Sequence, residues 1–249
     1  MKEKQEKEIL DFLQNNQYAS IDDLAKQLFI SPSTVRRKLN NLQSKGLVTR
    51  VHGGVQLNDT NHFSPSFTFR VHQNSFEKKK MALAAIKLIK EGDLIFLDGT
   101  TSAFFIAEYL LEFKNIRVIT NGIDTLSLLS KYDIEAYSTG GYVNRDNRSV
   151  LVGNYAEKMI ENFHADIAFF SAQSVDDEGQ IYDCFEKENV IRKAMIRNAS
   201  KRAFLCDSTK FGKTSPFRLC SLKDVDYIVS NNELPTNIQE RFGEKFVTI

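Results

Sequence analysis

Hydrophobic and polar positions follow two different patterns along the chain. In the first 57 residues, apolar side chains recur at helical spacing within residues 4–16, again after a Ser-capped start at Ser20, and again at Val35, Leu39 and Leu42. From residue 76 onwards, short apolar runs alternate with amphipathic stretches. The first pattern predicts a small helical domain, and the second predicts strands that alternate with helices.

The third N-terminal helix has the clearest start signal. Ser31 precedes Pro32, the order of an N-cap residue followed by proline at the first helical position. Gly46 predicts the end of this helix, and the stretches 47–51 and 55–57 predict a β-hairpin. Two helices, a tight turn, a capped helix and a hairpin are the element order of a winged helix-turn-helix.

The rest of the chain predicts an α/β fold. The expected strands are residues 94–97, 116–120, 134–137, 167–171, 203–206, 227–230 and 246–249. The expected helices are residues 78–90, 102–111, 123–130, 155–162 and 189–199. This alternation indicates a mostly parallel sheet covered by helices. We therefore expect a DNA-binding domain at residues 1–57, a polar linker at 58–74 and an α/β domain at 75–249.

Composition narrows the class of protein. Hydrophobic residues make up 42% of the chain and charged residues 26%, which excludes a mostly disordered chain. No apolar run approaches the roughly 20 residues of a membrane span, and no signal segment opens the chain, so we expect a cytoplasmic protein with no membrane partner. The three cysteines are an odd count without metal-ligand spacing. We expect no cofactor and no metal site.

Charge separates the two predicted domains. Residues 1–57 hold nine Lys and Arg against six Asp and Glu, a net charge of +3, whereas the remaining residues hold 24 against 26, a net charge of −2. From Leu24 to Asn58 there are six basic residues and no acidic one. A basic segment on a near-neutral body is typical of a module that binds a polyanion such as DNA.

The basic segment coincides with the predicted recognition helix. With Val35, Leu39 and Leu42 buried, polar side chains occupy the rest of its first two turns, where arginine can bond guanine and hydroxyls can bond phosphate. The alternative interpretation is a solvated helix face on a packing module. The expected DNA-binding residues are Ser31, Ser33, Thr34, Arg36, Arg37 and Lys38 of the helix, with Arg50 and His52 on the wing.

Small polar residues follow several of the predicted strands. The carboxyl ends of parallel strands meet at one edge of a sheet, where ligands bind, and hydroxyls, glycines and helix N-termini suit a phosphate. Taken singly, each of these turns is more typical of helix capping or a tight turn. The expected effector-binding residues are Asp98, Gly99, Thr100, Thr101, Ser102, Thr120, Asn121, Gly140, Gly141, Arg148 and Lys210.

The motif from Ser31 through Arg37, with Leu39, Leu42, Gly46 and the Arg50–Gly54 segment, resembles the DeoR family of bacterial transcription regulators. Two positions depart from the family pattern. Lys38 stands where the family usually has Asp, and Gln43 stands near the position of a usual Glu. Both changes remove negative charge from the expected DNA side, so we expect stronger sequence-independent binding.

The resemblance continues through the C-terminal half. Its motifs are Glu77-Lys78, Asp98-Gly99-Thr100-Thr101, Thr120-Asn121, Gly140-Gly141 and Asp207 to Gly212. They look like the sugar-phosphate sensor domain of DeoR regulators, which is similar in fold to ribose-5-phosphate isomerase and the coenzyme A transferases. The resemblance implies that the 98–102 loop, Thr120, Asn121 and Lys210 contact a phosphorylated ligand. Asp98 is expected to bond sugar hydroxyls or to orient its loop.

An isomerase-like fold invites an enzymatic alternative, a sugar-phosphate isomerase with an appended DNA-binding module. Isomerisation needs a positioned carboxylate base. The Asp-Gly-Ala-Asp-Glu and Lys-Gly-Gly segments of the isomerases are missing here, residues 176–178 look like an exposed turn, and Glu186 and Glu188 have no identifiable partner. A third alternative is a body that only oligomerises.

We therefore expect a transcription regulator that is not an enzyme. The interpretation is a repressor of a carbohydrate-utilisation operon, whose binding to double-stranded operator DNA is controlled by a small phosphorylated sugar. Because helix-turn-helix proteins generally bind DNA as symmetric assemblies, we expect a homodimer or a homotetramer.

Overall fold

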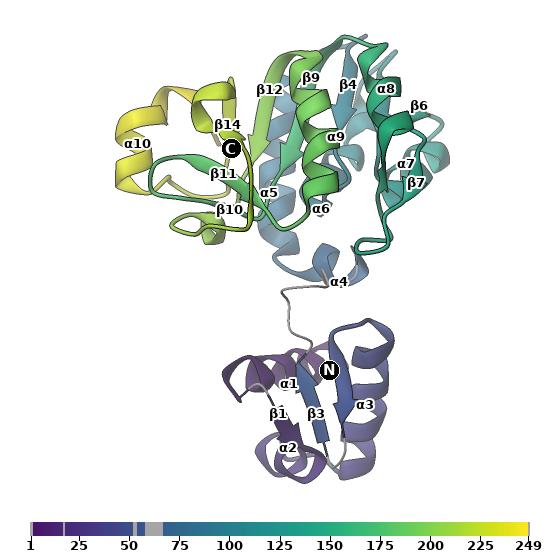
Figure 1. The fold of residues 1–249 in the computed structure, drawn as a ribbon, viewed down its shortest axis with the longest axis vertical. Helices are drawn as coiled ribbons and strands as arrows, with labels where there is room; N and C mark the ends of the chain where they lie inside the picture. Colours follow the sequence, from purple (N-terminus) through teal and green to yellow (C-terminus); the bar gives the residue numbers. More distant parts are fainter. Residues whose placement is uncertain (1, 17, 52–53, 58–66, 249) are drawn as a thin grey trace. The chain divides into compact units, whose positions relative to one another are not determined.

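The structure, a computed structural model, describes residues 2–16, 18–51, 54–57 and 67–248 (Figure 1). The chain forms two compact units, Met1–Arg70 and Val71–Ile249, which we call the N-terminal unit and the C-terminal unit. The predicted fold class is confirmed, because a helix-turn-helix domain is followed by an α/β domain on a parallel sheet.

The N-terminal unit combines helices with a small antiparallel sheet. Its helices are α1 (Lys2–Asn16), α2 (Ile21–Gln27) and α3 (Pro32–Ser44), and its strands, in sheet order, are β1 (Tyr18–Ser20), β3 (Gly54–Leu57) and β2 (Val48–Val51). Ser20 caps α2 by accepting the Asp23 backbone N–H at 3.0 Å, which stabilises the first turn. The strand β1 was not predicted, because it has three residues and depends on pairing with β3.

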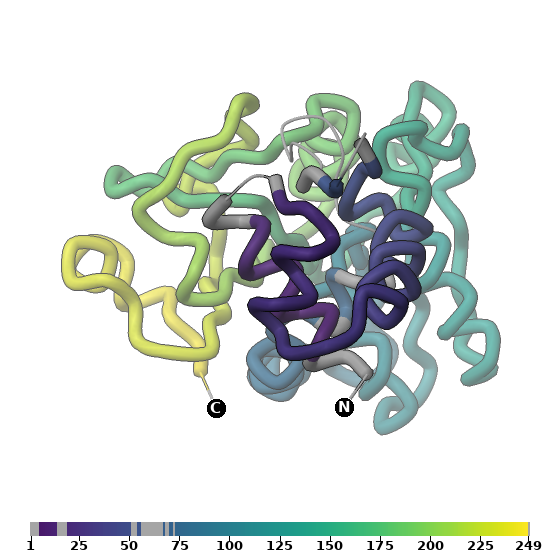
Figure 2. Tube along the Cα trace, turned by 90° about the horizontal axis from the view of Figure 1, so that it is seen from below, coloured from purple at the N-terminus to yellow at the C-terminus, as the bar shows by residue number. Residues whose placement is uncertain are grey.

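The C-terminal unit is built on seven parallel strands in the order β15-β14-β12-β9-β4-β5-β6. In Figure 1, β14 lies near one side of the unit and β6 near the other, and Figure 2 likewise shows the yellow C-terminal segments and the teal segments on opposite sides. The strands are β4 (Leu94–Leu97), β5 (Arg117–Thr120), β6 (Glu135–Ser138), β9 (Ala165–Ser171), β12 (Ala199–Leu205), β14 (Tyr227–Val229) and β15 (Phe246–Val247).

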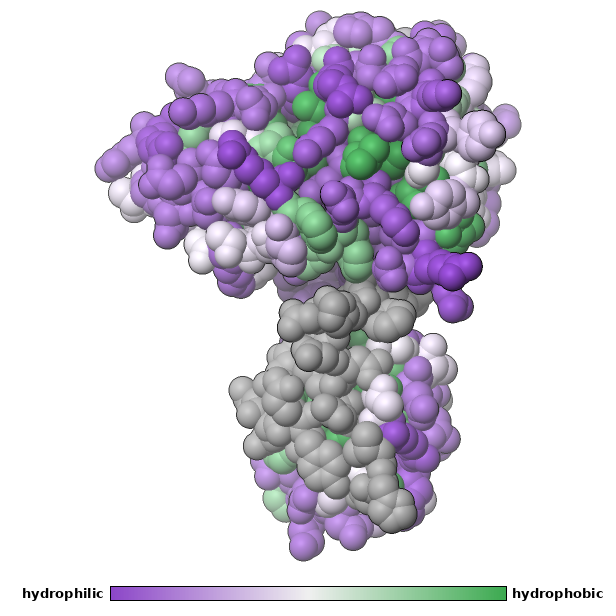
Figure 3. All heavy atoms as spheres, in the orientation of Figure 1, coloured by the Kyte–Doolittle hydropathy of each residue, from purple (hydrophilic) through white to green (hydrophobic). Residues whose placement is uncertain are grey.

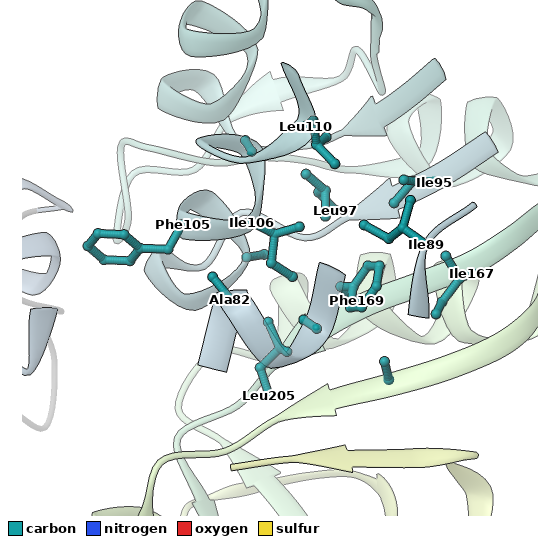
Figure 4. Packing of buried hydrophobic residues seen from close by; sticks show 14 of the residues in the cluster. Ala82, Ile89, Ile95, Leu97, Phe105, Ile106, Leu110, Ile167, Phe169 and Leu205 are labelled. Carbon is teal, nitrogen blue, oxygen red and sulfur yellow. The ribbon is translucent and has the colours of Figure 1, made fainter. Parts of the chain in front are cut away.

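Helices cover both faces of this sheet. Because side chains alternate along a strand, Ile95 and Leu97 pack toward α5 (Ser75–Ala85), α6 (Thr101–Ala107) and α7 (Ile123–Lys131). Leu94 and Phe96 pack toward α8 (Asn154–Glu161) and α9 (Glu186–Arg197). Figure 4 shows part of the first core, where labelled side chains converge from several elements: Ala82, Leu97, Ile106, Phe169 and Leu205.

Several short elements escaped prediction. They include α4 (Phe67–His72) inside the expected linker, of which residues 58–66 lie outside the described part of the chain. The others are the β7 (Tyr142–Val143) and β8 (Leu151–Val152) ribbon, the β10 (Ser174–Val175), β11 (Gln180–Asp183) and β13 (Phe217–Ser221) sheet, and α10 (Thr236–Phe242).

One face of the C-terminal unit is mostly polar. On the face shown in Figure 3, the C-terminal unit is largely hydrophilic, with hydrophobic patches near its centre. Among the described residues, no helix has both the length and the apolar character needed to cross a lipid bilayer.

The strand order reverses direction at one point of the sheet. From β4 the chain adds β5 and β6 on one side, and then returns to add β9 and β12 on the other. In open α/β sheets, ligands bind beyond the carboxyl ends of the strands where the order reverses. We call the edge where these parallel strands end the carboxyl edge; its reversal point lies between β4 and β9.

The turn between α2 and α3 contains an unfavourable residue. Phe29 adopts a left-handed backbone conformation with φ of 53°, and its side chain is 94% exposed. A bulky side chain disfavours this conformation, which Asn tolerates.

We predict that Phe29→Asn raises the free energy of unfolding of the N-terminal unit by about 1 kcal/mol. The exposed ring has little packing to lose, and Asn relieves the backbone penalty. Hydrogen exchange across residues 21–44 of the full chain measures the effect. Phe29→Ala is the control, because alanine keeps the penalty. Equal or lower protection in Phe29→Asn would contradict the prediction.

Candidate functional site

The N-terminal end of α3 gathers hydroxyl groups. Ser31 caps the helix by accepting the Thr34 backbone N–H at 3.2 Å. Its Oγ also lies 2.9 Å from the hydroxyls of both Ser33 and Thr34. Pro32 occupies the first helical position, as predicted. The expected phosphate-compatible groups therefore lie together at one helix end.

The exposed face of α3 carries two arginines. Val35, Leu39 and Leu42 are buried in the core of the N-terminal unit, whereas Arg36 and Arg37 are exposed. Arg50 on β2 reaches this helix, because its Nη2 lies 3.5 Å from the Arg36 carbonyl oxygen. The structure thus brings cations of the wing strand and of the helix side by side.

The position of Lys38 differs from the prediction that its side chain faces DNA. Its side chain is only 4% exposed, and its Nζ lies 3.8 Å from Glu6 Oε1. Lys45 donates to the other oxygen of Glu6 at 2.6 Å. Burial opposes ionisation of Glu6, but the hydrogen bonds from Lys45 and Asn41 and the nearby positive charges lower the pKa of this carboxyl. Lys38 therefore packs toward α1 rather than onto the expected DNA-facing surface. His52, the other wing residue, lies outside the described residues.

In the C-terminal unit, Asp98 holds the loop that follows β4. Its Oδ1 accepts the backbone N–H of Thr100 at 3.1 Å and also the Thr100 hydroxyl. Its Oδ2 accepts the backbone N–H of Ser171, at the end of β9, at 3.1 Å. Asp98 is completely buried. We expected Asp98 either to bond sugar hydroxyls or to orient its loop, and these contacts are of the second kind.

Lys210 reaches the same point from β12. Its Nζ donates to the Ser171 Oγ at 2.7 Å and lies 3.8 Å from Asp207 Oδ2. The Ser171 hydroxyl in turn donates to the Leu205 carbonyl at 2.6 Å. Ser171 therefore connects the loop after β4 to the ammonium after β12, at the point where the strand order reverses.

The loop after β5 lies beside Gly99. A Cβ on Gly99 would approach Asn121 Oδ1 to 3.4 Å and would collide with the Val150 side chain. Asn121 donates from Nδ2 to the Leu151 carbonyl at 3.1 Å. Its Oδ1 is buried and has no hydrogen-bond partner among the described residues. A buried acceptor without a partner is costly, and a bound ligand or water would satisfy it. Thr120 is also buried, and its Oγ1 accepts the Gly122 N–H at 3.0 Å.

The remaining predicted residues lie around the β7–β8 ribbon. Gly140 and Gly141 have positive φ angles of 67° and 91°, and a Cβ on Gly141 would collide with the Val152 carbonyl oxygen. Only glycine fits there. Arg148 is exposed on the 144–150 loop, whose Val150 covers Gly99. The contacts of Gly141 are thus with β8 and α8, rather than with Lys210.

Sequence reasoning missed the central cation. Arg192 on α9 is 5% exposed, and its guanidinium lies 3.0 Å from Asp98, 3.1 Å from Asp183 and 3.0 Å from Glu188. It also donates to Asn189 Oδ1 at 3.2 Å. Burial acts to lower the pKa of Arg192, but the three carboxylates outweigh it and raise the pKa, so the guanidinium stays charged. We call these five residues the Arg192 cluster.

The Arg192 cluster left a weak signal in the sequence. Glu188 and Arg192 are four residues apart on an amphipathic helix, among the buried positions Ile191 and Met195. Charged residues on the buried face of a helix indicate a buried ion pair. The structure also gives Glu188 the partner that its sequence context lacked.

Comparison with known proteins matches both units to one family. The family model described as the DeoR-like helix-turn-helix domain matches residues 6–61, and the DeoR C terminal sensor domain matches residues 73–232. The solved ribose 5-phosphate isomerase A from Methanocaldococcus jannaschii matches 55% of each chain at 21% identity, with a TM-score of 0.42.

Curated relatives match over nearly the whole length. The L-fucose operon activator of Haemophilus influenzae is 31% identical and covers 93% of this chain and 93% of its own. The transcriptional repressor AccR of Agrobacterium fabrum is 32% identical and covers 96% of this chain and 94% of its own. With both domain matches in the order that the fold shows, this chain belongs to the DeoR family of transcriptional regulators.

Proposed function

We propose that this regulator is a repressor of a carbohydrate-utilisation operon and that a phosphorylated sugar releases it from its operator. The observation that carries the effector half is the Lys210 ammonium, held by Ser171 at the reversal point of the sheet. A coupling free energy of roughly 1–3 kcal/mol between the two sites is sufficient for regulation. The relatives named above include an activator and a repressor, and repression is our proposal for this chain.

The DNA half rests on the exposed surface of α3 and β2. Arg36 and Arg37 are exposed in the first turns of α3 and Arg50 lies beside them, where arginine can read guanine or neutralise phosphate. The hydroxyls of Ser31, Ser33 and Thr34 supply phosphate contacts that fix the register. Helix-turn-helix proteins read symmetric sites, so we propose a homodimer or a homotetramer.

The effector half rests on complementary groups at the carboxyl edge. Lys210 supplies positive charge for a phosphate, and hydrogen bonds through Ser171 and Asp98 connect it to the Thr100 turn. The unpaired Asn121 Oδ1 is an acceptor for a sugar hydroxyl. Arg148 provides a second cation on the loop that covers Gly99. Gly140 and Gly141 shape the adjoining ribbon.

The contacts of the carboxylates near the 98–102 loop favour binding of a sugar phosphate over its isomerisation. Isomerisation requires a carboxylate base that can take a proton from the substrate. Asp98, Asp183 and Glu188 each bond Arg192, so all three carboxylates are engaged within the protein rather than directed at a ligand. We therefore propose that the sugar phosphate is bound and released unchanged.

We predict that Arg37→Ala weakens specific operator binding by about 1–3 kcal/mol, because one base-contacting or phosphate-contacting cation is lost. The slope of log affinity against log salt should fall by about one if the contact is to phosphate. Fluorescence anisotropy on operator DNA measures both. Lys38→Met is the matched variant: it should leave the salt slope unchanged, because Lys38 faces Glu6. Wild-type affinity in Arg37→Ala would refute the proposed recognition surface.

We predict that Lys210→Ala reduces affinity for the sugar phosphate at least tenfold, because a charge-assisted hydrogen bond is lost, while the ligand-free variant still binds the operator specifically. Calorimetry and anisotropy test the two halves. Lys213→Ala is the control, since Lys213, three residues after Lys210, is exposed and donates to the Thr209 carbonyl oxygen. Unchanged ligand affinity in Lys210→Ala would place the effector elsewhere.

A further inference from the structure

One amide side chain connects the Lys210 loop (residues 206–212) to α5. Asn231 follows β14 at the carboxyl edge, and its Oδ1 accepts the backbone N–H of Ser208 at 2.9 Å. Its Nδ2 donates to Glu77 Oε2 at 2.8 Å. The two segments it joins are far apart in the sequence. Both bonds belong to one planar group, so a displacement at one end changes the geometry at the other.

The Ser208 end of this connection belongs to a turn with several internal hydrogen bonds. Asp207 accepts the backbone N–H of Thr209 at 3.1 Å and also bonds its hydroxyl. Lys210, at the end of the same helical turn, donates from its backbone to the Asp207 carbonyl at 3.1 Å. The Lys210 ammonium, 3.8 Å from Asp207 Oδ2, therefore belongs to the same hydrogen-bonded turn as Ser208.

The Glu77 end belongs to the first turn of α5. The next residue, Lys78, is buried, and its Nζ donates to the Gln73 carbonyl at 2.6 Å. Gln73 lies between α5 and α4, and the chain continues from α4 toward the N-terminal unit. Farther along α5, Met81 and Ala85 pack in the sheet core. The first turn therefore links the core to the segment that leads to the DNA-binding unit.

We propose that Asn231 is the coupling residue that reports occupancy of the Lys210 site to α5. The inference rests on the proposed function. When an anion draws the Lys210 ammonium from Ser171 and Asp207, the Lys210 loop shifts and the Ser208–Asn231 bond changes. The Asn231–Glu77 bond changes with it, and the first turn of α5 gains or loses stability. Coupling of this kind requires an element whose equilibrium both sites bias, and that element is the first turn of α5.

Two substitutions separate the halves of this connection. Asn231→Asp keeps an oxygen acceptor for the Ser208 N–H, but it removes the donor to Glu77 and places two carboxylates together. Adding Glu77→Gln to Asn231→Asp returns an amide donor opposite a carboxylate and restores the bond. Asn232→Ala is the matched control, because Asn232 is exposed and bonds the Ser208 Oγ, at 3.5 Å, rather than the Ser208 backbone or Glu77.

The first arm of the test uses hydrogen exchange on the full chain without ligand. Asn231→Asp should lower protection in residues 75–85 by roughly threefold to tenfold, the effect of one lost hydrogen bond. The double variant should recover most of this protection, and Asn232→Ala should match the wild type. Unchanged protection of residues 75–85 in Asn231→Asp, or no recovery in the double variant, would overturn the proposal whatever the ligand is.

The second arm repeats the exchange with inorganic phosphate, the group common to all sugar phosphates. In the wild type, phosphate should alter protection in residues 206–212 and in 75–85; in Asn231→Asp, it should alter only 206–212. A wild-type response confined to 206–212, or an α5 response that survives Asn231→Asp, overturns the relay but leaves the anion site intact. No response in either segment overturns the proposed effector site, and the relay with it.

Discussion

The carboxyl edge depends on one buried guanidinium. Arg192 is surrounded by three carboxylates that come from the end of β4, the end of β11 and its own helix. Breaking a buried pair by removing one partner leaves an uncompensated charge and costs about 3–5 kcal/mol. The ion pairs therefore hold the end of β4 against the end of β11 and the start of α9, which lie far from β4 in the sequence.

The Arg192 cluster extends to the loop that covers Gly99. Glu188 accepts hydrogen bonds from Asn147 at 2.9 Å and from Asn144 at 3.4 Å. Asp98 accepts a hydrogen bond from Arg192 through Oδ2, and its Oδ1 accepts the backbone N–H of Thr100. The loops that we propose to contact the effector are thus held by a buried network of ion pairs. Such a network preorganises a binding site. It also engages the carboxylates that would otherwise be candidates for a catalytic proton acceptor.

Local patterns predicted the elements whose formation depends on local residues. The apolar run at 94–97 is the strand β4 with the same bounds, because a strand buried on both faces reads as a continuous hydrophobic stretch. The Ser31-Pro32 pair predicted the start of α3, because an N-cap residue and a proline at the first helical position act locally. Contacts between distant residues could not be read this way. Lys38 is buried because Glu6 lies opposite it on another helix, and Asp98 meets Arg192 only after the sheet has formed.

We propose that DNA binding and sugar-phosphate binding occur on one chain and influence each other. Fluorescence anisotropy of this chain on DNA from the upstream region of its own gene, titrated with salt and then with a panel of sugar phosphates, tests this coupling. We expect specific, salt-sensitive binding that one phosphorylated sugar reverses. Specific binding that every compound leaves unchanged would contradict the sensor, and turnover of a sugar phosphate without specific DNA binding would contradict the account as a whole.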